Sequence, residues 1–390
     1  MSDFFRHSGG ELHAEGVPIS RIAAAVGTPF YLYSTAAFAT QYRRFAEAFA
    51  SERPLICYAV KANSNLAVLR LFAGLGAGAD VVSEGELRQL SEVAAARGRV
   101  APVAIRVNPD VDAHTHAKIS TGMKGSKFGI DFGAVVGAYR LAGELPGIEP
   151  VGLAVHIGSQ LVELEPYRRA FICVSELVRE LRTLGLTVSR IDLGGGIGIR
   201  YRAEAPPDPE SYARLVRETF GSLALAMTFE PGRVLSGQAG LLVARVVLVK
   251  EGAIKRFVIV DAAMNDLIRP ALYEAWHDIV PVRYPPPGAV LAPADVVGPI
   301  CETGDTFAVD RDLPPLVEGD LVAFTATGAY GAVMSSTYNS RLLIPEVLVS
   351  DHRFEIIRAR PTYDDMLSLD TVPDWLSGAV LEPERNRGAA

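Results

Sequence analysis

The stretch LICYAVKANSN, residues 55–65, places an apolar run directly before a lysine and a polar turn. Residues 56–60 predict a buried β-strand, and residues 62–65 have the composition of a turn. A lysine at the end of a buried strand indicates a function, because burial favours the neutral amine and a neutral amine can form a Schiff base. The structural alternative for Lys61 is an ammonium group that reaches solvent or pairs with a carboxylate.

Similar apolar runs recur through the first half of the chain and alternate with helical patterns. A helix is predicted from Pro166, with an apolar face that ends before Gly185. Such alternation predicts a parallel sheet or barrel, in which functional groups gather at the carboxyl ends of the strands. The expected strands are residues 56–60, 79–83, 103–108, 152–157, 190–193 and 226–230.

The second half of the chain has strand patterns without long helices between them. It therefore predicts a mostly antiparallel β domain. We expect a (β/α) barrel domain over residues 34–233, a β domain made of residues 1–33 and 234–390, and a frayed tail after Pro383. The expected strands of the β domain are residues 241–249, 257–260, 295–300, 321–325 and 342–349.

Composition narrows the class of protein. The chain has 390 residues, 49% of them hydrophobic and 21% charged, which is typical of a globular protein large enough for two domains. A net charge of −7 argues against a nucleic-acid partner. The three cysteines are far apart and predict no disulfide framework. With no long apolar segment for a signal peptide or membrane span, we expect a cytoplasmic protein.

Five short motifs carry the candidate chemistry, and each alone has an ordinary explanation. The triplet Gly194-Gly195-Gly196 can bind a phosphate through its amides or form a tight turn. Glu230 and Arg233 can form a surface ion pair, His156 can be a core residue, and Cys301 can be an inert thiol. The motifs are His156–Gln160, Asp192–Gly196, Glu230–Arg233, Cys301–Asp305 and Gly328–Gly331.

Two other kinds of site are disfavoured. A dinucleotide motif fails after the glycine triplet because position 199 is Ile, and Gly74-x-Gly76-x-x-Ala79 leads from a helix into a strand, which is the wrong order. A metal site at His114-x-His116 beside Asp112 has an incomplete ligand set, so we expect no metal.

Together the five motifs resemble the alanine-racemase-like, pyridoxal-phosphate (PLP) dependent decarboxylases over nearly the whole chain. The resemblance implies a PLP-binding barrel of the TIM type, a C-terminal β domain and a homodimer with shared active sites. Lys61 matches the lysine that binds PLP, Glu230 the carboxylate at the pyridine nitrogen, and His156 the histidine against the ring. The implied cofactor contacts are Lys61, Asp80, His156, Ser159, Gly194, Gly195, Gly196, Glu230, Gly232, Arg233 and Tyr330.

Residues 261–273 sharpen the resemblance toward the branch of the family that acts on diaminopimelate. The implied reaction is decarboxylation of meso-2,6-diaminopimelate to L-lysine and CO2. Glu302 matches the group that binds the distal ammonium. Cys301 matches a proton donor that the neighbouring subunit supplies. The implied substrate contacts are Arg233, Arg269, Tyr273, Glu302 and Tyr330.

One segment departs from the family. Only residues 88–105 lie between the Gly85-Glu86-Leu87 motif and Arg106, where family members carry two further βα units, so we expect a barrel shortened to about six units. The join falls near the start of a predicted helix, residues 86–97, beside Glu84, where the family often has glycine. Two alternatives follow. One is a sister decarboxylase for ornithine, arginine or carboxynorspermidine, and the other is a catalytically impaired relative.

Overall fold

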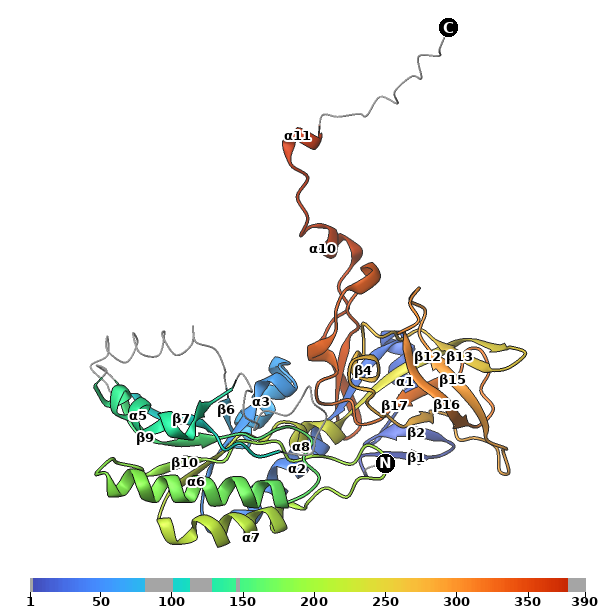
Figure 1. Ribbon diagram of the computed structural model, residues 1–390. Helices are drawn as coiled ribbons and strands as arrows, with labels where there is room; N and C mark the ends of the chain where they lie inside the picture. Colours follow the sequence, from blue (N-terminus) through green and yellow to red (C-terminus); the bar gives the residue numbers. More distant parts are fainter. Residues whose placement is uncertain (1–2, 81–100, 113–127, 145–147, 378–390) are drawn as a thin grey trace.

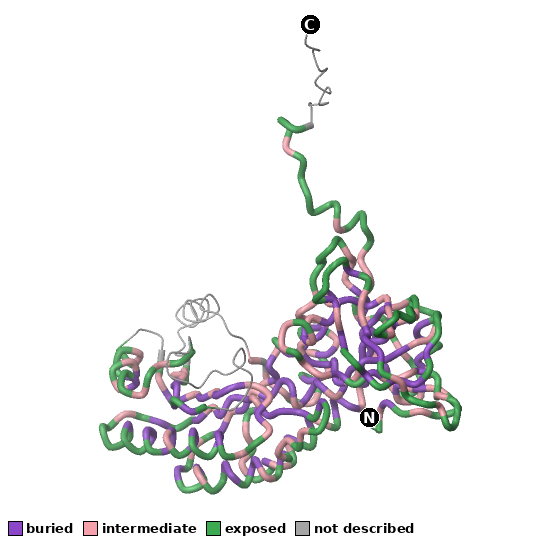
Figure 2. Tube along the Cα trace, turned by 45° about the vertical axis from the view of Figure 1, so that its right-hand side comes forward, coloured by how far each residue is buried: buried purple, intermediate pink, exposed green. Residues whose placement is uncertain are grey.

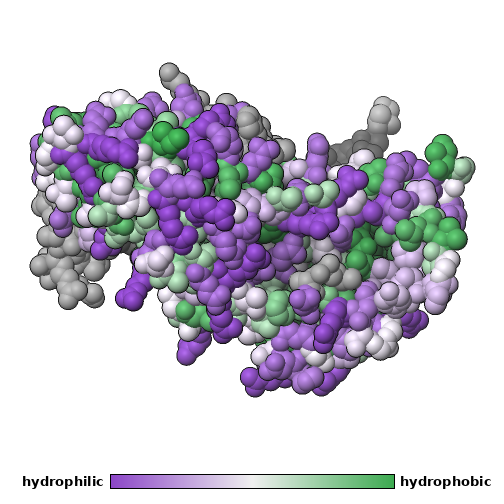
Figure 3. Space-filling view, turned by 90° about the horizontal axis from the view of Figure 1, so that it is seen from below, coloured by the Kyte–Doolittle hydropathy of each residue, from purple (hydrophilic) through white to green (hydrophobic). Residues whose placement is uncertain are grey.

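The computed structural model describes residues 3–80, 101–112, 128–144 and 148–377. A parallel sheet with helices on its faces lies beside a larger β domain, and the C-terminal segment extends away from both (Figure 1). Buried residues run between the sheet and its helices and through the β domain (Figure 2), while the face seen in Figure 3 is mainly hydrophilic. Among the described residues, no helix combines the length and apolar character needed to cross a bilayer.

The first sheet has seven strands, and every neighbouring pair is parallel. Within the described residues, β6 and β8 are the two ends of this sheet. The predicted strand–helix alternation is thus confirmed. In spatial order the strands are β6 (Gly78–Asp80), β5 (Leu55–Ala59), β11 (Ala226–Phe229), β10 (Arg190–Asp192), β9 (Ile148–Val155), β7 (Ala101–Asn108) and β8 (Ile130–Asp131).

Helices pack on this sheet through apolar faces. The helix predicted from Pro166 is α6 (Glu165–Thr183), which buries Phe171, Val174 and Leu177 and is followed by Gly185 at φ 76°. A glycine takes this left-handed conformation without a Cβ clash, so the chain can turn after the helix. The other helices here are α2 (Thr35–Ala48), α3 (Leu66–Gly74), α5 (Val135–Glu144) and α7 (Pro209–Phe220).

The β domain is built around one long strand, β12 (Gly240–Glu251), which pairs with β4, β13 and β17. Most pairs are antiparallel, as expected, but β13–β15 and β4–β18 are parallel. The strands are β4 (Phe30–Ser34), β13 (Arg256–Val260), β14 (Ile279–Pro281), β15 (Ala292–Val297), β16 (Thr306–Leu313), β17 (Leu321–Phe324), β18 (Glu346–Ser350) and β19 (Arg353–Arg358).

Smaller elements complete the chain. Strands β1 (Phe5–Ser8), β2 (Glu11–Ala14) and β3 (Val17–Pro18) form a separate antiparallel sheet. The remaining helices are α1 (Ile19–Val26), α8 (Arg233–Ser236), α9 (Arg269–Tyr273), α10 (Tyr363–Leu367) and α11 (Asp374–Ser377).

Several strand predictions need correction. The strand expected over 295–300 begins earlier and ends at Val297, and the one expected over 342–349 begins at Glu346. Strands β16 and β19 were not predicted, because charged residues interrupt their apolar alternation. Residues 81–83 of one expected strand, the helix over 86–97 with its flanking motif, and the tail after Pro383 lie outside the described residues.

Candidate active site

Charged side chains meet at the carboxyl edge of the parallel sheet. Asp80 and Asp192 end β6 and β10, and His156 and Glu230 directly follow β9 and β11. The spatial order of the strands brings them close enough that Asp192, Asp80 and Lys61 all change the pKa of Glu230. These side chains therefore lie together at the strand ends, as expected, and their functions stay predictions.

Lys61 stands beside a buried carboxylate. Its Nζ lies 3.7 Å from Oδ2 of Asp80, whose side chain is only 6% exposed. The Lys61 side chain is 46% exposed, so the prediction of a buried lysine is wrong for the free chain. The reason is local, since β5 ends at Ala59 and a 3-10 turn, Val60–Ala62, carries the lysine past the sheet. The amine is thus accessible and has an acidic neighbour.

Glu230 and Asp192 are two acidic side chains that lie close together. Burial, followed by the charges of Asp192 and Asp80, raises the pKa of Glu230 to about 8, and the charge of Lys61 opposes this rise. Burial also raises the pKa of Asp192, although the amide N–H of Gly194 donates to its Oδ1 at 2.8 Å and lowers it. Like charges in a poorly hydrated site disfavour ionisation of both groups. At neutral pH the Glu230 carboxyl therefore holds a proton.

His156 is neutral in this setting. Burial and the charges of Arg106 and Lys61 lower its pKa to about 3. Its Nδ1 accepts a hydrogen bond from the amide of Gly195 at 3.2 Å, which places the ring proton on Nε2. Arg106 also donates from Nη2 to the carbonyl of His156 at 3.2 Å. The glycine turn therefore orients the imidazole, and Arg106 of β7 holds the backbone of His156.

The glycine triplet forms a tight turn against the Glu230 segment. Gly194 and Gly196 have φ of 63° and 95°, and a Cβ on Gly195 would lie 2.3 Å from the carbonyl oxygen of Glu230. The amides of Gly194 and Gly195 already donate to Asp192 and His156. The expectation of free amides along the whole triplet therefore needs correction. The turn is needed for close packing.

A second group of residues surrounds Arg233, at the start of α8. Its Nη2 donates to the hydroxyl of Ser159 at 3.2 Å, and its guanidinium carbon lies 4.6 Å from the ring centre of Tyr330. The amide of Tyr330 donates to the carbonyl of Ala62 at 2.8 Å, which ties this group to the turn that carries Lys61. A Cβ on Gly232 would meet Ala59 and Ala62 at 3.0 Å, so this glycine also packs against that turn.

The remaining predicted residues divide into two sets. Arg269 is buried, at 5% exposure, and burial together with the like charge of Arg233 lowers the pKa of its guanidinium group. Tyr273 is half-buried at the end of α9. Cys301 and Glu302 are exposed in the turn after β15, where Tyr338 donates to Oε2 of Glu302 at 2.6 Å. Among the described residues of this single chain, no hydrogen bond or ion pair joins Cys301 or Glu302 to Lys61.

Two functional neighbours were not selected from the sequence. Arg106 and Asp192 are not among the site residues predicted from the sequence. Both stand at or near the carboxyl end of a strand, which is the signal that selected the other residues. Among the described residues, no cluster of His, Cys, Asp or Glu could hold a metal, and His114 and His116 lie outside them.

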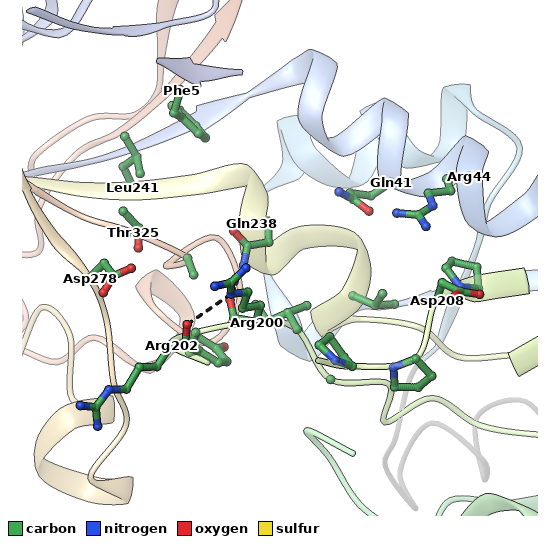
Figure 4. Close-up of a pocket in the computed structure, with 18 of the residues that line it drawn as sticks. Phe5, Gln41, Arg44, Arg200, Arg202, Asp208, Gln238, Leu241, Asp278 and Thr325 are labelled. Atoms are coloured by element: carbon green, nitrogen blue, oxygen red, sulfur yellow. Dashed lines mark hydrogen bonds between the residues drawn. The ribbon is translucent and has the colours of Figure 1, made fainter. Parts of the chain in front are cut away.

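A separate cavity of about 550 Å³ lies between the loop after the glycine triplet and the β domain (Figure 4). Arg200, Gln238, Asp278 and Thr325 line it together with apolar residues such as Leu241. Apart from Tyr201, which contacts Arg233, its lining is distinct from the residues gathered around Lys61.

The raised pKa of Glu230 predicts how the stability of the ligand-free protein depends on pH. Between the ordinary carboxyl value of 4.5 and the folded value of about 8, the folded chain holds a proton that the unfolded chain has lost. The free energy of unfolding therefore falls as pH rises through this range. Glu230→Gln should make the free energy of unfolding less dependent on pH and stabilise the protein at pH 8 by up to about 4 kcal/mol.

Thermal melts at pH 5 to 9 test this prediction, with exposed Glu318→Gln as the matched control. If the melting temperature of Glu230→Gln falls with pH as steeply as that of the unsubstituted protein, other groups cause the pH dependence.

Comparisons with known proteins show the family to which the chain belongs. Residues 35–101 and 86–237 match the family model described as pyridoxal-dependent decarboxylase, pyridoxal binding domain. The diaminopimelate decarboxylase of Pseudomonas aeruginosa is 46% identical over 408 aligned positions, covering 93% of this chain and 98% of the relative. That of Pseudomonas fluorescens is 45% identical and covers 98% of this chain and all of the relative.

Two solved structures are also similar. Diaminopimelate decarboxylase from Helicobacter pylori, complexed with L-lysine, superposes with a TM-score of 0.84 at 36% identity, covering 90% of this chain and 98% of that one. The enzyme from M. jannaschii, also in complex with L-lysine, gives 0.88 at 33% identity, with coverage of 96% and 99%.

Proposed function

This chain belongs to the pyridoxal-dependent decarboxylases and, within them, to the diaminopimelate decarboxylases, and from this premise we propose how its residues carry out the reaction. The protein is a carboxy-lyase that uses PLP to convert diaminopimelate to L-lysine and CO2 in lysine biosynthesis. The observation that best supports the residue assignments is that four polar side chains lie together at one edge of the parallel sheet. They are Lys61, Asp80, His156 and Glu230.

The described residues fit PLP by their chemistry. An accessible primary amine can bind the aldehyde carbon, a proton-holding carboxyl can face the ring nitrogen, and a serine with an arginine can bind the phosphate. Oδ2 of Asp80 is buried and, within the described chain, accepts no hydrogen bond, so it is available to a bound group beside Lys61. We assign Lys61, Asp80, His156, Glu230, Arg233 and Tyr330 to the cofactor, together with Ser159, Gly194, Gly195, Gly196 and Gly232.

When bound, PLP supplies an electron sink for the bond to the departing carboxylate. The contribution of Glu230 follows from its protonation, because a carboxyl with a pKa of about 8 can pass its proton to a ring nitrogen and remain beside it as a counter-charge. The neutral His156 adds no positive charge on its side of the site. Asp80 neutralises the ammonium form of Lys61 and keeps the amine in place.

We assign the substrate's distal end to Arg233, Arg269, Tyr273, Glu302 and Tyr330, since diaminopimelate needs both an anion and a cation site away from the reacting carbon. Cys301 is the proton donor after CO2 leaves. Because Cys301 and Glu302 are exposed on the β domain, we propose that the partner subunit of a homodimer supplies them. The association of two subunits would then complete each active site.

We also propose the division into a PLP-binding domain, residues 34–233, and a β domain of residues 1–33 and 234–390. Strand β4, which ends at Ser34, belongs to the β-domain sheet and supports this boundary. A barrel shortened to about six βα units is supported by the family model, which matches the chain in two separate segments that overlap over residues 86–101. An alignment of 408 positions also exceeds the 390 residues of this chain.

A substrate panel tests the function. With PLP present, we expect lysine and CO2 from meso-diaminopimelate at a kcat/KM at least about a hundredfold above that for ornithine or arginine, because those substrates lack the distal carboxylate that two arginines would bind. Faster turnover of ornithine, arginine or carboxynorspermidine would assign the chain to a sister activity. Absence of turnover in folded, PLP-loaded protein would favour the impaired relative.

A further inference from the structure

Arg233 and Arg269 are two buried cations whose neighbours are neutral. They are 7% and 5% exposed, and among the described residues no carboxylate lies within 4 Å of either guanidinium group. The Nε atom of each is buried without a hydrogen-bond acceptor in the described chain. Burying unpaired charges is costly, so a pair of this kind is suited to binding an anion. Two flexible guanidinium groups can bind one anion well only if something fixes their orientation.

Tyr201 contacts both arginines at once. Its hydroxyl accepts a hydrogen bond from Nη1 of Arg233 at 2.6 Å, and its ring lies 4.6 Å below the guanidinium carbon of Arg269. Tyr201 therefore positions Arg233 through its hydroxyl oxygen and Arg269 through the face of its aromatic ring. A phenol can do this without a negative charge that would compete with an anionic ligand.

His277 fixes Arg269 from the other side. The ring is fully buried, its Nδ1 lies 2.7 Å from the carbonyl oxygen of Thr325, and its Nε2 lies 2.8 Å from Nη1 of Arg269. A carbonyl only accepts and an arginine only donates, so the proton is on Nδ1 and Nε2 is the acceptor. Burial and the charge of Arg269 lower the pKa of His277 to about 3, which keeps the ring neutral.

The backbone around both residues is itself held in place. The amides of Tyr201 and Arg202 donate to Oε2 of Glu204, at 3.0 and 2.7 Å. The carbonyl of His277 accepts from Nη1 of Arg311 at 2.9 Å, and the rings of Tyr201 and His277 meet edge to face with centres 5.4 Å apart. Tyr201 is also one of the residues that line the cavity of about 550 Å³.

We propose that Tyr201 and His277 are positioning residues that orient Arg233 and Arg269 as one clamp for the substrate carboxylate remaining in the lysine product. The inference rests on the proposed function, which assigns these arginines to the distal end of the substrate. It adds that selectivity for a carboxylate depends on two neutral residues that need not touch the ligand. Preorganisation lowers the cost of ordering the arginines on binding.

The test compares two ligands of PLP-loaded protein by titration calorimetry. L-Lysine carries the carboxylate, and cadaverine is the same diamine without it. We expect Tyr201→Phe and His277→Leu each to weaken lysine binding about tenfold or more, the effect of losing a hydrogen bond to a charged group, and to change cadaverine binding less than about twofold. His277→Gln, which keeps an acceptor, should recover much of the lysine affinity.

Tyr139→Phe is the matched control, because it removes a buried tyrosine hydroxyl that bonds to backbone carbonyls of Pro150 and Thr187, on α5 and apart from the arginines. Equal losses for both ligands, or no loss for lysine, would overturn the positioning role. If His277→Leu does not fold, Tyr201→Phe still decides the question.

The unsubstituted protein separates the two proposals. If it binds lysine no better than cadaverine, the assignment of the arginines fails, and the positioning inference fails with it. If it prefers lysine and the variants keep the same preference, only the positioning inference fails.

Discussion

Lys61→Ala is expected to abolish the lysine-dependent visible absorption of bound PLP and to lower kcat by at least about 10³-fold, since a nucleophile that binds the cofactor covalently has no substitute in the site. The structure supports so large an effect because Lys61 is the amine beside Asp80, with Nζ 3.7 Å from its Oδ2. The lysine is 46% exposed, so its replacement removes little packing and the protein should remain folded. Absorption spectra and the rate of lysine formation measure the two effects.

Lys250→Ala is the matched control, because it removes an exposed lysine at the end of β12 and should leave spectrum and rate unchanged. Small primary amines should restore part of the activity of Lys61→Ala, because the lost group is an amine at an accessible position. If Lys61→Ala keeps the visible absorption band of bound PLP, another amine binds the cofactor and the assignment of Lys61 is wrong.

The parallel half of the fold could be predicted from the sequence because its strands are apolar runs separated by helices with clear start and stop signals. The strand predicted over 190–193 is β10, Arg190–Asp192, and the helix predicted from Pro166 is α6. The β domain was harder, since β16 and β19 are partly exposed and their charged residues obscure the alternation. Their pairing depends on contacts distant in sequence, which local patterns do not encode.

The sequence predicted which residues belong to the site better than it predicted how their charges affect one another. Each strand end supplies one polar residue, and this identified Lys61, His156 and Glu230. The coupling among Asp80, Asp192 and Glu230 follows from the spatial order β6–β5–β11–β10, which differs from the order along the chain. The exposure of Lys61 was missed because the 3-10 turn after Ala59 leaves the sheet earlier than the apolar run ends.

The proposed sharing of active sites leads to the second large effect. Cys301 lies exposed on the β domain, where a neighbouring subunit could reach it, and we propose that it acts in the site of that subunit. Cys301→Ala alone should lower kcat by about 10² to 10⁴-fold, the usual contribution of a positioned proton donor, while PLP still binds. Unchanged turnover would remove the role of Cys301.

Mixing Lys61→Ala with Cys301→Ala should then restore activity. If each site takes Lys61 from one subunit and Cys301 from the other, a mixed dimer has one site with both defects and one with neither. Random reassociation makes half of the dimers mixed, so the mixture should recover about a quarter of the parent activity. Lysine formation after dissociation and reassociation of equal amounts measures this recovery.

The doubly substituted chain, Lys61→Ala with Cys301→Ala, supplies the opposite control when mixed with the unsubstituted protein. With shared sites, every mixed dimer has one defect in each site, so activity falls to about a quarter of that of the same total amount of unsubstituted dimer. With sites built within one chain, each mixed dimer keeps an intact site, so half of the activity remains, and the first mixture shows no recovery. The two mixtures contain the same substitutions in equal number and differ only in which chain carries them, so their comparison isolates the origin of Cys301.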